Sequence, residues 1–75
     1  MKVHIELRHI SDRSYCANRI IDWKDFPKCG SIIYGCCSWV RVVAWERVIP
    51  KVGDMEKFKI YVEESDFKPE NLQSI

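Results

Sequence analysis

The stretch that most restricts the fold is the apolar run over residues 31–49, SIIYGCCSWVRVVAWERVI, which is rich in Val, Ile, Trp and Tyr. Branched and aromatic side chains suit a pleated, half-buried sheet better than a helix. The run predicts two strands, 31–34 and 39–49, joined by a turn over 35–38. A helix is the competing interpretation, because Val42, Trp45 and Ile49 would share one helical face.

Alternation along the predicted strand 39–49 separates two kinds of residue. The even positions are apolar except for Glu46, which predicts a core face. The odd positions combine two Trp with two Arg, namely Trp39, Arg41, Trp45 and Arg47. Eleven residues at ~3.3 Å each would span about 36 Å, which is long for a small domain. We therefore expect a bulge or a bend near 44–46, and a bulge would move Glu46 to the outside.

Two further segments alternate and predict half-buried strands, residues 2–10 and residues 57–63. Pro50 and Gly53 lie in the turn that precedes the second of them. With the central run and the segment discussed next, they give a predicted core of Val3, Ile5, Leu7, Ile20, Trp23, Val40, Val42, Phe58, Ile60 and Val62.

Residues 13–24 predict a helix. Ser11 or Asp12 can cap it, and Cys16, Ile20 and Trp23 follow helical spacing. A strand is the alternative, because Tyr15, Ala17, Ile21 and Trp23 share one parity.

These elements predict an α+β domain in which one helix packs on an antiparallel sheet of about four strands, in the order β-α-β-β-β. If residues 13–24 are extended, the chain becomes a small five-stranded barrel. The segment YVEESDFKPENL, residues 61–72, resembles the end of SH3-like barrels, where a strand runs into an acidic turn, a Pro and a short helix. The chain lacks the aromatic peptide-binding motif of that family, so the resemblance implies a fold and no function. Residues 64–75 are expected to form a C-terminal tail or short helix, with Pro69 suited to its first turn.

Length and charge predict one domain over residues 1–75 with no strong field of its own, because the net charge is +1. No stretch reaches the ~18 apolar residues of a membrane span, and the first residues carry charges where a signal peptide has its apolar segment. We therefore expect a cytoplasmic protein without a membrane partner, whose four Cys are reduced thiols.

Metal binding and catalysis find little support in the spacing of the reactive residues. Structural zinc sites usually place two ligands two to four residues apart, whereas Cys16, Cys29, Cys36 and Cys37 do not. No Gly-rich phosphate loop or paired-carboxylate signature is present in the sequence. We expect no metal, no cofactor and no enzymatic activity.

A non-catalytic protein-binding module is the function that the sequence favours, because Trp, Tyr and Arg are enriched at interface hot spots. The small size and the composition of the chain suit an inhibitor or regulator of a larger protein, of the kind that bacteriophages and mobile elements encode as accessory proteins. The alternative is a single-stranded nucleic-acid module that uses Trp and Arg on one sheet face. The oligomeric state stays open. In both cases the predicted partner-binding residues are Trp39, Arg41, Trp45, Arg47 and Tyr61.

Overall fold

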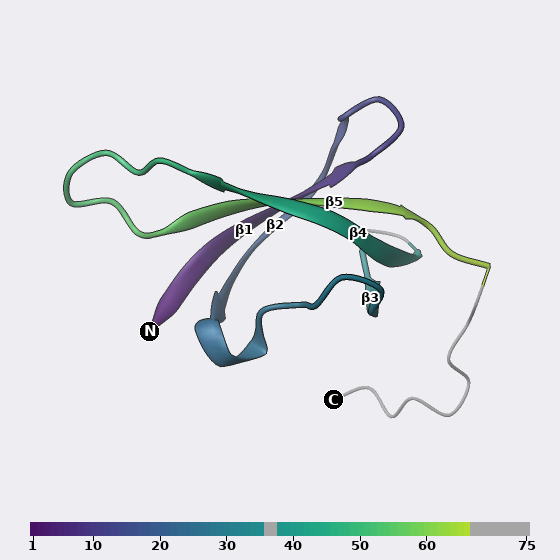
Figure 1. Ribbon diagram of the computed structural model, residues 1–75, viewed down its shortest axis with the longest axis horizontal. Coiled ribbons are helices and arrows are strands. Elements are labelled where there is room, and N and C mark those ends of the chain that lie inside the picture. The colour runs from purple at the N-terminus through teal and green to yellow at the C-terminus, as the bar shows by residue number, and fades with distance from the viewer. Residues whose placement is uncertain (36–37, 67–75) are drawn as a thin grey trace.

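Five strands form a single sheet in the computed structural model, which describes residues 1–35 and 38–66 (Figure 1). The sheet curls into a half-barrel with the strand order β2-β1-β5-β4-β3. In chain order the elements are β1 (Lys2–His9), β2 (Tyr15–Asp22), the 3-10 helix η1 (Trp23–Asp25), β3 (Ile32–Tyr34), β4 (Trp39–Val48) and β5 (Lys57–Glu64).

The sheet is mixed, which corrects the prediction of an antiparallel sheet. β3, β4 and β5 do form the expected antiparallel meander, and β1 and β2 form an antiparallel hairpin. These two units meet where β1 pairs in parallel with β5, from His4 opposite Lys57 to His9 opposite Val62.

The predicted α+β class is wrong, because residues 15–22 form β2 and the described residues contain no α-helix. Asp12, expected to cap a helix, instead accepts a hydrogen bond from Ser14 N–H at 2.9 Å within a tight turn. Arg13 adopts a positive φ of 62° in that turn. The turn sends the chain back along β1, whose edge supplies the backbone partners that a helix would have supplied internally. The nearly all-strand half-barrel fits the SH3-like alternative.

The core lies on one face of the sheet, here called the inner face, which carries Val3, Val42 and Ile60. Eight of the ten predicted core residues are buried there: Val3, Ile5, Leu7, Val40, Val42, Phe58, Ile60 and Val62. The two others, Ile20 and Trp23, were assigned to the predicted helix over residues 13–24, which does not form. Ile20 lies opposite His4 on the outer face and is 62% exposed, and Trp23 is 46% exposed in η1.

The predicted bulge in β4 is present, one residue before the expected stretch. The register shifts between Val42 and Ala44, so that Val43 has no partner on β5. Beyond this residue the faces exchange: Trp45 lies opposite Ile60 on the inner face, and Glu46 lies opposite Lys59 on the outer face. A single extra residue therefore decides which Trp faces the core.

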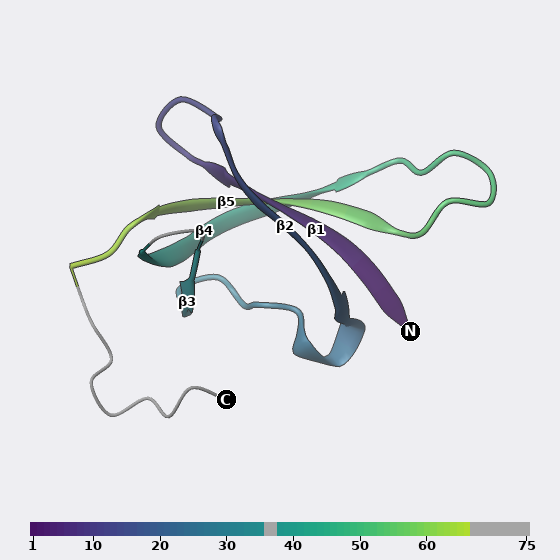
Figure 2. The same cartoon turned by 180° about the vertical axis from the view of Figure 1, so that it is seen from behind.

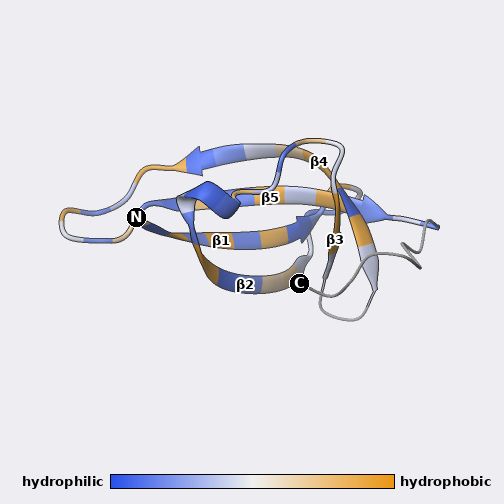
Figure 3. Ribbon diagram, turned by 90° about the horizontal axis from the view of Figure 1, so that it is seen from below, coloured by the Kyte–Doolittle hydropathy of each residue, from blue (hydrophilic) through white to orange (hydrophobic). Residues whose placement is uncertain are grey.

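The segment 23–31 and β3 lie on the same side of the sheet in both views (Figures 1 and 2). Phe26, in this segment, packs against the buried core from the inner face. Farther along, Arg19 Nη2 donates to Gly35 O at 3.2 Å, which joins β2 to the turn after β3. Viewed from below, apolar and polar residues alternate along several strands, as a sheet with one buried face requires (Figure 3). The expected C-terminal helix and part of the turn after β3 fall in residues 67–75 and 36–37, outside the described residues.

Candidate functional site

Four aromatic rings gather at one end of the inner face, where β4 ends and β5 begins. Phe58, on β5, is buried and lies at the centre of the group. Its ring centroid is 5.0 Å from that of Phe26, 5.5 Å from Trp23 and 5.6 Å from Trp45. Phe26 also contacts both Trp rings, at 5.1 Å from Trp23 and 5.7 Å from Trp45. These tilted and edge-on arrangements are those that aromatic pairs favour.

A hollow of about 360 Å³ opens among these rings, and we call it the aromatic cleft. Trp23 and Trp45 flank it and remain 46% and 48% exposed. The lining residues are Met1, Trp23, Trp45, Arg47, Glu56 and Phe58. Half-exposed Trp rings beside a buried Phe leave adjoining apolar surface in water, and grouped apolar surface of this kind can serve as a contact site.

The charges at the rim of the aromatic cleft are paired with one another. Arg47 donates twice to Glu56, from Nε at 2.9 Å and from Nη2 at 2.7 Å. These hydrogen bonds, together with the negative charge of Glu56, raise the pKa of Arg47 above its ordinary value, so that it stays charged. The rim therefore presents a compensated ion pair.

The five predicted partner-binding residues do not share a face. Because of the bulge, Trp45 and Arg47 lie on the inner face at the aromatic cleft, opposite Ile60 and Phe58. The other three, Trp39, Arg41 and Tyr61, lie on the outer face of the sheet.

On the outer face each of these three side chains has a local partner. The ring of Trp39 stands edge-on to Tyr34 at 5.3 Å. Arg41 Nε donates to Glu63 at 3.0 Å, and the hydroxyl of Tyr61 donates to Glu46. The hydrogen bond to Glu46, with burial and the negative charge adding to it, raises the pKa of Tyr61. On the outer face these three side chains are thus each engaged with a neighbouring residue.

Sequence reasoning missed Trp23, Phe26 and Phe58 as site residues. Trp23 and Phe58 were predicted to be core, and Phe26 was assigned no role. The available signal was the segment WKDF, residues 23–26, which begins and ends with an aromatic residue. Two aromatic residues three positions apart can meet on one side of a 3-10 turn, as Trp23 and Phe26 do.

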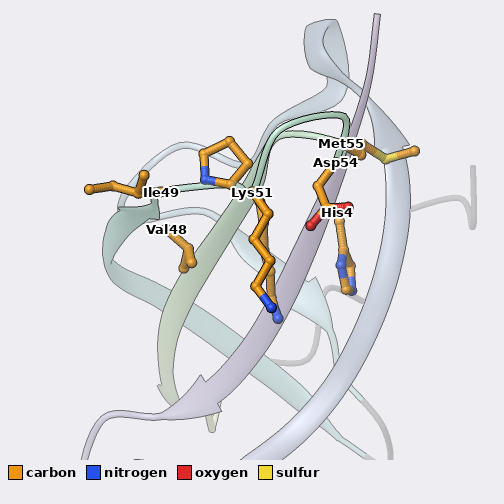
Figure 4. Close-up of a pocket in the computed structure, with 8 residues that line it drawn as sticks. His4, Val48, Ile49, Lys51, Asp54 and Met55 are labelled. Atoms are coloured by element: carbon orange, nitrogen blue, oxygen red, sulfur yellow. The ribbon is translucent and has the colours of Figure 1, made fainter.

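A second hollow, of about 440 Å³, lies at the base of the loop between β4 and β5 (Figure 4). His4, Lys51, Asp54 and Met55 help to line it, whereas Ile49 points away from His4 in this view. The imidazole Nε2 of His4 forms a hydrogen bond with Asn18 Oδ1 at 2.9 Å. The lining mixes charges of both signs with aliphatic groups and brings together no set of catalytic groups that we recognise.

Among residues 1–35 and 38–66, no group of three or more His, Cys, Asp or Glu side chains could hold a metal ion. The same part of the chain includes no helix with the length and hydrophobicity to cross a bilayer.

Comparison with protein-family models, with curated proteins and with solved structures finds no significant match to this chain. Neither the fold nor these comparisons provide evidence for an inhibitor or a bacteriophage accessory protein, and the mostly-β fold contradicts the α+β description that accompanied that expectation.

Proposed function

We propose that this chain is a non-catalytic protein-binding module whose aromatic cleft receives an apolar side chain of a partner protein. The observation that carries the proposal is the pair of half-exposed rings, Trp23 and Trp45, around the buried Phe58. Covering the exposed halves of both Trp would remove on the order of 200 Å² of mostly apolar surface from water, a gross gain of ~5 kcal/mol.

The compensated charges around the cleft support a neutral apolar ligand. Arg47 is held by Glu56, so a cation and an anion entering the cleft would each meet a carboxylate and a guanidinium together. The single-stranded nucleic-acid alternative has less support, because the bulge divides the Trp and Arg residues between two faces and Arg41 is paired with Glu63. Binding to phosphates relies on basic groups that can release counterions.

The test compares two Trp→Ala variants on the same strand. Trp45→Ala removes a wall of the aromatic cleft, and Trp39→Ala is the matched control on the outer face. We expect proteins captured from native cell extract by the wild type to be retained by Trp39→Ala and lost with Trp45→Ala. Their capture should fall only modestly between low and high salt, because apolar burial is not screened.

Folding of the variants is checked by urea unfolding. Since Trp45 is 48% exposed, Trp45→Ala should lower the free energy of unfolding by about 2 kcal/mol, roughly half the loss for a fully buried aromatic residue. Equal capture by Trp45→Ala and the wild type would contradict the proposal, and so would equal loss with both variants.

A further inference from the structure

The free side of β4 offers a further site, because β4 is much longer than its neighbour β3. Pairing with β3 covers only Trp39 to Arg41. One more residue, Val42, exchanges hydrogen bonds with the segment before β3, donating to Ser31 O at 2.9 Å and accepting from Gly30 N–H at 2.7 Å. No described residue pairs with positions 43–48 on the side away from β5, and we call this stretch the free edge.

The backbone groups at Trp45 and Arg47 point toward the free edge. On β5, Val62 O accepts from Ile10 N–H at 2.8 Å, and Glu56 O accepts from His4 N–H at 2.8 Å. The even-numbered residues of β5 thus use their peptide groups on the β1 side. Ile60 and Phe58 belong to this set, so the residues opposite them, Trp45 and Arg47, do not bond to β5.

Natural edge strands are usually shortened, bent away or protected by Lys and Pro, because an open edge can pair with another strand. Residues 43–48, VAWERV, carry neither Lys nor Pro. Their two charges are already engaged within the sheet, Glu46 with Tyr61 and Arg47 with Glu56. Val43 and Trp45 are 39% and 48% exposed. The free edge is therefore six residues long, and its protection consists of the bulge at Val43 at one end and of two charges that are paired within the sheet.

We propose that an extended segment of the partner protein adds to the free edge of β4 as a sixth strand and places an apolar side chain over the aromatic cleft. This inference rests on the proposed function and specifies how the partner binds. Main-chain hydrogen bonds to Trp45 and Arg47 would supply affinity, and alternate side chains of the segment would supply specificity.

The two faces of β4 define the chemistry of the added strand. On the inner face its side chains would lie beside Trp45 and Phe26, which favours apolar residues. On the outer face they would lie beside the exposed carboxylate of Glu46, which accepts from the Tyr61 hydroxyl and lies opposite Lys59 but forms no ion pair with a described residue, and this favours Lys or Arg. The expected segment alternates apolar and basic residues.

A second copy of this chain is a poorer occupant. Antiparallel pairing of two free edges about a two-fold axis at Glu46 would place two carboxylates opposite each other. An axis at Trp45 would place Glu46 opposite Ala44. Neither register supplies the basic neighbour that Glu46 favours.

The experiment uses the full chain and a capped peptide that alternates Val and Lys. One control peptide has the same residues arranged in two blocks, and another alternates Val and Glu. We expect only the Val/Lys peptide to slow hydrogen exchange at the Trp45 and Arg47 amides, by about tenfold or more. The amides of Ala44 and Glu46, which face β5, should change little.

Two variants at one position isolate the main-chain contact. Arg47→Ala loses the ion pair with Glu56 and keeps the N–H, whereas Arg47→Pro also removes the N–H, at an edge where Pro is tolerated. Arg47→Pro should bind the Val/Lys peptide roughly tenfold more weakly than Arg47→Ala, the effect of about one hydrogen bond.

Equal binding by Arg47→Pro and Arg47→Ala would overturn strand addition, as would equal binding of the Val/Glu peptide or no binding of any peptide. Concentration-dependent protection of Trp45 and Arg47 without peptide would overturn it in favour of a second copy. Strand addition can fail while the proposed function holds. This is the result if any of these outcomes is found and Trp45→Ala nevertheless loses the captured protein.

Discussion

Glu6 is the only charged side chain that lies buried among the described residues, and it sits on the outer face of β1, an interior strand of the sheet. Burial by itself would raise its pKa. Hydrogen bonds and charge from Arg8 and Lys57, the latter 3.3 Å away, outweigh burial and hold the pKa of Glu6 below its ordinary value. A carboxylate between two cations thus joins β1 to β5 across the outer face.

The lowered pKa makes stability depend on pH in a definite direction. Glu6 adds stability at neutral pH, and this contribution is lost as pH falls from the unfolded pKa through the lower folded one. We expect Glu6→Gln to lower the free energy of unfolding by about 1–2 kcal/mol at pH 7, since charged hydrogen bonds are lost.

Urea unfolding at pH 7 and at pH 3 measures this difference, which should shrink at the lower pH. Glu63→Gln is the control, because Glu63 pairs with Arg41 at an exposed position and should cost less. An equal loss of unfolding free energy in Glu6→Gln at pH 7 and at pH 3 would contradict the account of Glu6 as a carboxylate held between Arg8 and Lys57.

At the scale of single elements, the bulge at Val43 determines which side chains of β4 reach the aromatic cleft. Deleting Val43 would remove the bulge and leave a regular strand in which Ala44 follows Val42, so that Trp45 stays on the inner face and Glu46 on the outer face. We expect the deletion to lower the free energy of unfolding by less than ~2 kcal/mol, since no side chain of β4 changes face.

Val43→Ala is the matched control, because it keeps the residue count of β4. Val43 is 39% exposed, so this substitution should cost less than about 1 kcal/mol. Thermal unfolding followed by circular dichroism compares the two variants. A much lower melting temperature for the deletion than for Val43→Ala would contradict the placement of the extra residue at Val43.

The strands with clear period-two alternation could be predicted from sequence, as β1, β4 and β5 show. β2 could not, because Cys16 and Ile20 fit a helical stripe while Ala17 and Ile21 fit a strand. Pairing with the side of β1 that β5 does not occupy decided in favour of the strand. The residue pattern of β2 itself does not show that this side of β1 is available. Half of the aromatic cleft could be predicted from the sequence. Trp45 and Arg47 were identified as site residues, whereas Trp23 and Phe26 come from a segment without periodicity.

At the scale of the whole molecule, the curl of the half-barrel brings β2 close to the turn after β3. Gly35 is buried there, and a Cβ at this position would lie 3.3 Å from Cys16 Sγ and 3.4 Å from Ser38 O. Both distances are tight for a real side chain. The absence of a side chain at Gly35 therefore lets the two ends of the sheet approach.

Gly35→Ala should lower the free energy of unfolding by about 1–2 kcal/mol through overpacking. Cys16→Ala removes the sulfur in the way, so the double variant should lose less than the two single losses combined. A double-mutant cycle from urea unfolding measures this coupling. Strictly additive losses would show that Gly35→Ala destabilises the protein by some route other than its contact with Cys16.

The parallel pairing of β1 with β5 has a consequence for how the protein is made. Among the described strands β1 is synthesised first, and its parallel partner β5, which lies at the centre of the sheet, is synthesised last. Until then the nascent chain can form only the β1–β2 hairpin and parts of the meander, with the apolar side of β1 uncovered. Closing so long a loop is slow compared with forming a hairpin. Synthesis of β5 therefore completes the core in one late step, and the unfinished chain has the greatest need of chaperone protection just before it.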